Sequence, residues 1–400
     1  MNVALRHSPS PNRALPAAAG RLSRVAIFDD LAAVEPLWRG LEAQDCLTTP
    51  FQRYDFLGPW QRHVGARAGV LPFIVVGFDA LGETICLWPL GRRQAGPLRV
   101  VEFLGGKHAS FNLPIWRRET AAGATKAMLD AIVAQLGSSA DALILRNQPR
   151  AWEGIANPIA LLPHQPSPDA VHSGKLLPDF EALAREQISS AKRKKIRNRE
   201  RQLLTHGPVR FWRAQTQAQA HELLAVFHAQ KARRMQELGI ANVFDEPGVH
   251  EFIAEALTSG IASNPAIEFY GLAAGDTTVA TWAGVAGGGR FSGTFTSFIH
   301  NEIATASPGQ ILLMRLVQDC CKRGLATFDL GVGDAGYKEM FCKDVEPLID
   351  SFLPLNSSGR LAVFAAQAAF RVKRAIKRNP ALWSMVTAVR RLRGRLSSGK

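Results

Sequence analysis

The sequence predicts an α/β protein that contains two copies of one folding unit. Two observations lead to this prediction. Each half of the chain has a pair of strand-like segments around a glycine turn, at 71–93 and at 266–289. Each pair is followed by another strand, a helix and a closing apolar strand. Each half should therefore be a mixed, mostly antiparallel sheet flanked by helices, with one parallel strand after a crossover helix.

The elements follow in the same order in both halves. In the first half, we expect a helix over 30–44, the hairpin, a strand over 98–106, a helix over 119–137 and a strand over 141–148. In the second half, we expect helices over 217–238 and 246–259, the hairpin, a strand over 290–299, a helix over 309–323 and a strand over 326–332.

The helix over 309–323 should be mostly buried. Its polar side chains fall at i, i+3, i+4 and i+7 and form one stripe, which consists of Arg315, Gln318, Asp319 and Lys322. The rest of its surface is apolar. Ser307, Pro308 and Gln310 read as a helix cap with a capping box, whereas Gly309 in the first turn costs about 1 kcal/mol and is not explained by a cap.

Composition suggests five segments: a flexible leader over 1–21, an N-terminal half over 22–180, a basic helical linker over 181–205, a C-terminal domain over 206–356 and a basic amphipathic tail over 357–400. The leader is rich in Ala and Pro and lacks the apolar stretch of a secretory signal, so we expect a cytoplasmic protein.

The five cysteines do not suggest a disulfide framework or a zinc site. They are odd in number and contain no C-x-x-C pair, and we expect no metal. The adjacent Cys320 and Cys321 should fill the buried side of the 309–323 helix. The cysteines are Cys46, Cys86, Cys320, Cys321 and Cys342.

The formal net charge of +14 is unevenly distributed. No acidic residue follows Asp350, and a second basic block lies at 191–202. Such clustering favours a polyanionic partner: a phosphate cofactor, a nucleic acid or an acidic membrane surface. The block at 191–202 is either a solvated connecting helix or a polyanion contact, and it lacks the interleaved aromatic residues that stack on RNA bases.

The tail predicts an amphipathic, cationic helix over 361–378 that ends at Asn379-Pro380. Leu361, Phe364 and Val372 belong to its apolar face, and more basic and apolar residues follow up to 395. Two alternatives remain open: binding to an anionic membrane surface through 361–395, and docking on the protein's own surface.

A helix N-terminus that contains a glycine can hold a phosphate, because free backbone N–H groups point at the anion. The Ser-Pro-Gly loop at 307–309, "RGLATFDLGVGD" at 323–334 and "YKEMF" at 337–341 resemble the bacterial CelD-like family of exopolysaccharide-associated acetyltransferases. This family belongs to the GNAT superfamily and is distantly similar to the Fem-type transferases. The resemblance extends over 22–355 and is sharpest over 278–341.

The resemblance implies tandem GNAT-like halves and an acyl-CoA donor, either acetyl-CoA or a longer acyl-CoA. The pyrophosphate of coenzyme A would lie on residues 307–310 and on the backbone N–H groups of Ile311 and Leu312, and the pantetheine arm would lie beside the strand over 290–299. The implied donor-binding residues are Thr296, Ser297, Phe298, Ser307, Pro308, Gly309, Gln310, Ile311 and Leu312.

Direct acyl transfer requires a base for the acceptor and a proton for the departing thiolate. The catalytic candidates are Asp329, Asp334, Tyr337 and Glu268, with Lys338 as a substrate-binding candidate. Asp334 has a second interpretation as a helix N-cap, and Asp329 as a solvent-facing strand residue.

The first half has no loop equivalent to the phosphate site, and its segment over 105–112 is a glycine-rich polar loop of another kind. Lys107, His108 and Asn112 could line an acceptor cleft there, and the alternative is a simple surface connection.

Our hypothesis at this stage is an acyl-CoA-dependent N- or O-acyltransferase that works in a ternary complex. The acceptor implied by the resemblance is an envelope polysaccharide or its precursor, and peripheral association with the inner face of the membrane is an option. The alternatives are a Fem-like transferase that uses aminoacyl-tRNA, and a catalytically silent, membrane-associated scaffold for polysaccharide synthesis.

Overall fold

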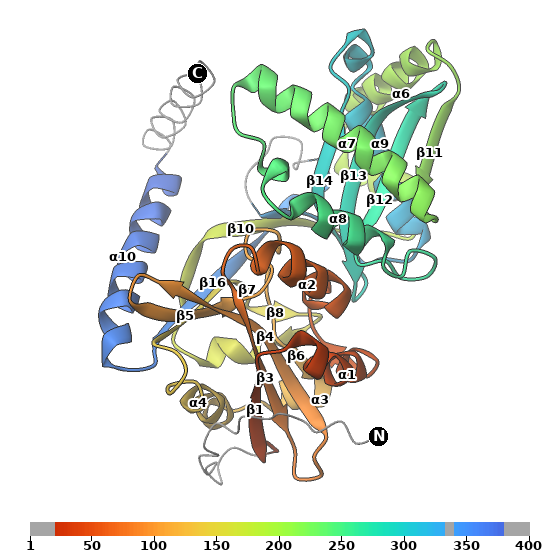
Figure 1. Ribbon diagram of the computed structural model, residues 1–400. Helices are drawn as coiled ribbons and strands as arrows, with labels where there is room; N and C mark the ends of the chain where they lie inside the picture. The colour runs from red at the N-terminus through yellow and green to blue at the C-terminus, as the bar shows by residue number, and fades with distance from the viewer. Residues whose placement is uncertain (1–20, 333–339, 380–400) are drawn as a thin grey trace, which may run out of the picture.

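The computed structural model describes residues 21–332 and 340–379. Within them, one sheet of 14 strands runs through both halves of the chain, and helices cover its faces (Figure 1). The sheet is mixed and mostly antiparallel, which confirms the predicted fold class. None of the described helices is long and apolar enough to cross a lipid bilayer.

The first half has the predicted order of strands. β3 (Leu71–Phe78) and β4 (Thr84–Ala95) form an antiparallel hairpin. β5 (Leu98–Phe103) pairs antiparallel with β4, and β7 (Ala142–Pro149) pairs parallel with β5. The parallel pairing follows from the crossover helix α4 (Lys126–Ala134) between β5 and β7.

The prediction of one helix over 119–137 is wrong in one respect. α3 (Arg118–Ala122) ends at Gly123, and α4 begins anew after Thr125. The hydroxyl of Thr125 accepts a hydrogen bond from the backbone N–H of Met128 at 3.2 Å, which starts the new helix.

The second half repeats the arrangement. β12 (Glu268–Ala274) and β13 (Thr277–Gly287) form the hairpin, β14 (Arg290–Phe298) pairs antiparallel with β13, and β15 (Thr327–Val332) pairs parallel with β14. The crossover helix is α9 (Pro308–Lys322). Two of its buried residues are Cys320 and Cys321, as expected from the sequence.

Two strands cross between the halves. β10 (Gln165–Lys175) follows the first half in sequence but pairs with β15 of the second half. β16 (Asp344–Pro354) follows the second half but pairs with β7 of the first half. β10 and β16 also pair with each other, so the two half-sheets become one. The sequence-based domain boundaries remain a prediction; each of these two strands lies inside its own predicted segment but pairs with a strand of the other half.

Helices cover both faces of the second half-sheet. α7 (Gln217–Leu238) and α8 (Val249–Thr258) lie on one face, and α9 and α6 (Ser190–Leu204) lie on the other (Figure 1). α8 also contacts α2 (Tyr54–Trp60) of the first half, where the rings of Phe56 and Phe252 meet edge to face at 5.2 Å. This contact closes one side of the space between the halves.

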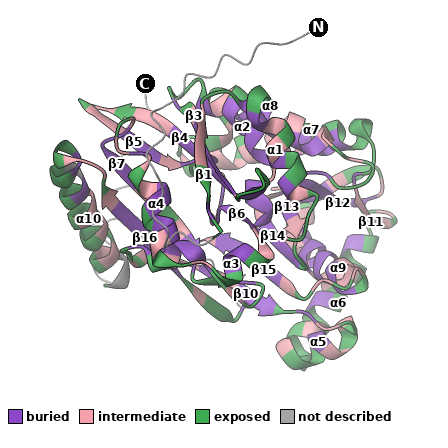
Figure 2. Ribbon diagram, turned by 90° about the horizontal axis from the view of Figure 1, so that it is seen from below, coloured by how far each residue is buried: buried purple, intermediate pink, exposed green. Residues whose placement is uncertain are grey.

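The remaining elements complete the edges and connections. They are β1 (Arg24–Phe28), α1 (Leu31–Glu42), β2 (Cys46–Leu47), η2 (Pro50–Gln52), η3 (Gln61–Gly65), β6 (Ile115–Arg117), β8 (Ala151–Trp152), β9 (Ile155–Ala156), η4 (Pro158–Leu161), α5 (Phe180–Gln187), β11 (Val209–Arg213), η5 (Val243–Asp245), η6 (Glu302–Ala306) and α10 (Ser357–Arg378). Buried residues concentrate in the sheet and on the inner faces of the helices, whereas α10 is largely exposed (Figure 2).

Candidate active site

β14 and β15 are paired over only part of their length. Their ladder joins Arg290–Ser292 to Thr327–Asp329 and then stops, although β14 continues to Phe298 and β15 to Val332. Beyond Ser292, β13 is the only described strand that pairs with β14. The backbone groups on this open edge of β14 are thus free of strand pairing, although Lys231 Nζ donates a hydrogen bond to the Thr296 carbonyl at 3.1 Å.

A β-bulge lies where the strands part. Ala283 of β13 faces Phe295, but the next residue, Gly284, faces Gly293, so Thr294 is the extra residue of β14. A bulge changes the direction of the side chains that follow it, which is a common feature next to active sites. Here it turns Phe295 toward α7, where its ring lies 4.7 Å from that of Phe227.

Asp329 holds the paired part of the two strands together. Its carboxylate accepts hydrogen bonds from Arg290 Nε at 2.6 Å, from the Ser292 hydroxyl at 2.5 Å and from the Gly331 N–H at 2.8 Å. Burial raises the pKa of Asp329, and the ion pair with Arg290 opposes that rise. Asp329 has no exposed surface, so the alternative that it faces solvent is wrong.

A cavity of about 260 Å³ lies between the end of β14 and the start of α9. We call it the α9 cavity. It gathers six of the nine residues that the sequence assigned to donor binding: Thr296, Phe298, Ser307, Pro308, Gly309 and Gln310, with Trp282, Ala304 and Leu313 beside them. Of the other three residues, Ser297 donates a hydrogen bond to Gln230 of α7. The side chains of Ile311 and Leu312 are in the core, and the assignment of these two residues rests on their backbone N–H groups.

The first turn of α9 differs from the predicted cap. Ser307 adopts a left-handed conformation with φ 52°, and its side chain makes no capping hydrogen bond. Gln310 Oε1 accepts a hydrogen bond from Arg199 of α6 at 2.7 Å, so it does not complete a capping box. The backbone N–H groups of Gln310 and Ile311 point back to the Ser307 carbonyl, at 3.0 and 3.4 Å.

The structure accounts for the glycine at 309. A Cβ at this position would lie 3.3 Å from the ring of Phe298, which is tighter than most contacts of this kind. The bare backbone therefore lets α9 begin against the Phe298 ring and keeps the mouth of the α9 cavity open.

The basic helix α6 lies beside the same end of α9. Ile196 and Leu203 are buried under it, and Gln202 donates a hydrogen bond to Thr305 of η6 at 2.9 Å. One side of α6 is thus packed, and five cations of the helix remain exposed: Lys192, Lys194, Lys195, Arg197 and Arg201.

Glu268 lies at the opposite end of α9. It forms a two-pronged ion pair with Arg323 at 2.6 Å, and its carboxylate accepts a hydrogen bond from Tyr270 at 2.7 Å. Arg323 is the C-cap of α9, and the 15 residues of that helix span about 22 Å. The structure does not bring Glu268 together with the other candidates.

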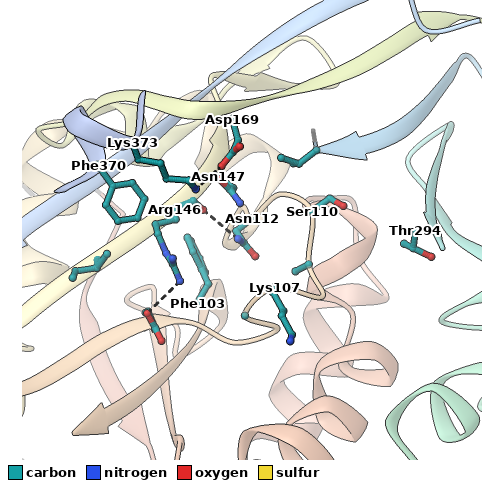
Figure 3. Close-up of a pocket in the computed structure, with 15 residues that line it drawn as sticks. Phe103, Lys107, Ser110, Asn112, Arg146, Asn147, Asp169, Thr294, Phe370 and Lys373 are labelled. Carbon is teal, nitrogen blue, oxygen red and sulfur yellow. Dashed lines mark hydrogen bonds and ion pairs between the residues drawn. The ribbon is translucent and has the colours of Figure 1, made fainter. Parts of the chain in front are cut away.

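A cavity of about 420 Å³ lies between the two halves (Figure 3). This inter-half cavity is lined by Lys107 and Asn112, as the sequence suggested, and by Thr294 of β14. Other lining residues were missed by sequence reasoning, because they come from three distant elements: Arg146, Asn147, Asp169, Phe370 and Lys373.

Charges in the inter-half cavity are paired. Lys373 of α10 lies 3.2 Å from Asp169, and Arg146 lies 3.6 Å from Glu102. Asn112 donates a hydrogen bond to the Arg146 carbonyl at 3.1 Å (Figure 3). The cavity therefore offers hydrogen-bonding groups without a large excess of one charge.

A smaller, aromatic cavity of about 160 Å³ adjoins it and shares Lys107, Ser110 and Thr294. His108 lies on its wall with Phe244 and Phe252. Burial, followed by the charge of Lys107, lowers the pKa of His108 to about 4. The Trp60 indole N–H donates to His108 Nδ1 at 3.0 Å, so the neutral ring carries its proton on Nε2.

Three of the sequence candidates, Asp334, Tyr337 and Lys338, lie outside the described residues. The last described residue before them, Val332, lines the inter-half cavity.

Comparisons with known proteins address the second half of the chain. Residues 190–339 match the family model described as an acetyltransferase (GNAT) domain. No curated protein matches the chain.

Solved structures resemble the whole fold. FemX has a TM-score of 0.55 at 9% identity, over 80% of this chain and 96% of its own. A conserved protein of unknown function from Bacteroides thetaiotaomicron has a TM-score of 0.51 at 12% identity, over 83% of this chain and 100% of its own. At these identities the likeness concerns the fold alone, and it extends beyond residues 190–339 to both halves.

Proposed function

We propose that the protein is an acyl-CoA-dependent N- or O-acyltransferase that transfers the acyl group directly in a ternary complex. The observation that carries the proposal is the position of β14 between two cavities. Thr294, the bulged residue, lines the inter-half cavity, and Thr296 lines the α9 cavity. Two residues of strand span about 7 Å, so a donor and an acceptor on either side would meet at the bulge.

The α9 cavity would hold the donor. The positive end of the α9 dipole would favour the pyrophosphate of coenzyme A, and Gly309 leaves room for its approach; the N–H groups of Gln310 and Ile311 would have to turn from the Ser307 carbonyl to bond to it. The exposed cations of α6 lie close by and would attract the remaining phosphate. The pantetheine arm would follow the open edge of β14.

In the reaction, the nitrogen or oxygen of the acceptor would attack the thioester carbon while its proton passes to a base. The carbonyl oxygen would be stabilised by N–H groups on the open edge of β14, and the C–S bond would break as the thiolate gains a proton. Asp329 and Glu268 are buried in ion pairs, which makes them poor proton acceptors. Asp334 and Tyr337 are our candidates for the base and the acid.

The inter-half cavity would hold the acceptor. Its paired charges, its amides and the rings of Phe103 and Phe370 suit an uncharged, hydroxyl-rich molecule, which could stack on an aromatic face and exchange many hydrogen bonds. A sugar unit of an envelope polysaccharide, the acceptor implied by the CelD-like resemblance, fits this description.

We also propose that the protein binds an anionic membrane surface through α10. Leu361 is 77%, Phe364 67% and Val372 58% exposed, although all three are large and apolar. The opposite side of the helix packs on the sheet, where Val363 is buried. The outward face is therefore available to lipids, and the chain carries no acidic residue after Asp350 that would oppose the contact.

The first experiment is a thermal-shift titration with acetyl-CoA, longer acyl-CoAs and free CoA. At 100 times the dissociation constant, binding stabilises the native state by about 2.7 kcal/mol. Gly309→Val should abolish the response, because its side chain would fill the entrance beside Phe298. Gly40→Val is the matched control, since Gly40 is also in a helix but a Cβ there meets nothing within 4 Å.

If wild type responds to none of these ligands, the donor assignment is wrong. Salt-sensitive binding of charged tRNA that is lost when the exposed cations of α6 are replaced would then favour a Fem-like transferase. A stable fold that binds neither donor would favour a scaffold.

A further inference from the structure

Three side chains converge where α7, η5 and α8 meet, outside the proposed active site. They are His228 of α7, Asp245 of η5 and His250 of α8, and their nitrogen and carboxylate oxygen atoms lie within 4.8 Å of one another. The rings of His228 and His250 stack with centroids 3.6 Å apart. His250 Nε2 lies 3.4 Å from Asp245 Oδ1.

The position of His228 is unfavourable without a ligand. Both of its ring nitrogens are shielded from solvent, and neither has a hydrogen-bond partner in the described structure. A buried polar group without a partner costs about 1–3 kcal/mol. A cation on one nitrogen would remove part of this cost, because the lone pair of a neutral imidazole is a good metal ligand.

We propose that His228, Asp245 and His250 form a zinc site. Two imidazoles and a carboxylate are typical zinc ligands, whereas Mg²⁺ and Ca²⁺ prefer oxygen ligands alone. Ligands at about 2.0–2.1 Å from zinc lie about 3.3 Å apart, so the three groups must close, and His250 must turn out of its stack with His228 because imidazole lone pairs lie in the ring plane. The side chains of Asp245 and His250 are 57% and 49% exposed and can rotate without repacking the core.

The site would be structural and would influence the neighbouring aromatic cavity. Phe244, next to Asp245, and Phe252, two residues after His250, both line that cavity. A bound ion would tie η5 and α8 to α7 and thereby fix this wall. The site does not depend on the proposed acyltransferase activity, so it can be tested independently.

The test is zinc binding to the full chain after treatment with EDTA, measured by competition with a chromogenic chelator and by thermal unfolding. Wild type should bind one zinc ion per chain and become more stable. His250→Ala and His228→Phe should each weaken binding by about tenfold or more, since the loss of even an outer-shell partner has this effect. Mg²⁺ should give no response.

Two variants keep the result unambiguous. His228→Phe preserves the stacked ring and removes the unpaired nitrogens, so its metal-free form should be at least as stable as wild type. His221→Ala removes an exposed histidine of the same helix and should bind zinc like wild type. The proposal is wrong if wild type binds no stoichiometric zinc, if His228→Phe binds as tightly, or if His221→Ala loses affinity equally.

Discussion

At the scale of single residues, the protonation of His108 can be worked out from its partners. The Trp60 indole occupies Nδ1, and burial lowers the pKa of the ring to about 4. In the unfolded chain the pKa is about 6.5. Between these values the unfolded chain binds a proton that the native state does not. The free energy of unfolding therefore decreases as the pH falls below about 6.5.

His108→Gln should remove this pH dependence, because glutamine does not titrate and can still accept a hydrogen bond. Between pH 7 and pH 5, wild type should lose about 2 kcal/mol more of its unfolding free energy than the variant. Urea unfolding at several pH values measures this difference. Parallel pH profiles for the two proteins would contradict the assignment.

At the scale of elements, two helix starts that look alike in sequence differ in the structure. Thr125 caps α4 through its hydroxyl, whereas Ser307 before α9 is left-handed and makes no such bond. Thr125→Ala should therefore lower the unfolding free energy by about 1 kcal/mol. Ser307→Ala should change it by less than about 0.5 kcal/mol. Equal losses in chemical unfolding of the two variants would refute this distinction.

The order of the elements was predictable because it depends on local patterns. Helical periodicity over 217–238 gave the bounds of α7, and the glycine turns gave both hairpins. The exchange of β10 and β16 was not predictable, since it pairs residues nearly two hundred positions apart, such as Gln165 with Asp350, without a local signal.

The same contrast applies to the sites. The contiguous Ser-Pro-Gly motif identified the α9 cavity, and Thr296 and Phe298 belong to the strand before it. The inter-half cavity and the His228 cluster join residues from separate elements with no recognisable spacing, so only the fold brings them together.

At the scale of the whole molecule, α10 connects two proposed functions. Its inner face supplies Phe370 and Lys373 to the inter-half cavity, and the Phe370 ring packs 5.2 Å from that of Phe352. Its outer face carries the exposed apolar residues. The predicted docking on the protein and the predicted membrane contact are therefore compatible, because they use opposite sides of one helix. A protein bound to the membrane by the outer face would hold its acceptor cavity close to the lipid surface.

We therefore expect the full chain to co-sediment with vesicles of phosphatidylcholine and phosphatidylglycerol, and to do so less at high salt. The double variant Leu361→Ser/Phe364→Ser should bind at least about tenfold more weakly, since each buried apolar side chain contributes about 1.5–3 kcal/mol. Its thermal stability should not fall, because both side chains already face solvent. Leu81→Ser, at a residue that is 88% exposed in the first half, is the control.

Three outcomes would exclude the membrane contact. The first is that wild type remains in solution with anionic vesicles. The second is that Leu81→Ser loses as much binding as the double variant. The third outcome is a lower melting temperature of the double variant without lipid, which would mean that protein already covers the outer face of α10. If the double variant also changed its oligomeric state, the covering segment would belong to a second copy of the chain. If it stayed in the same oligomeric state, the covering segment would be residues 380–400. Weaker vesicle binding at unchanged stability is the result that only a lipid-facing α10 explains.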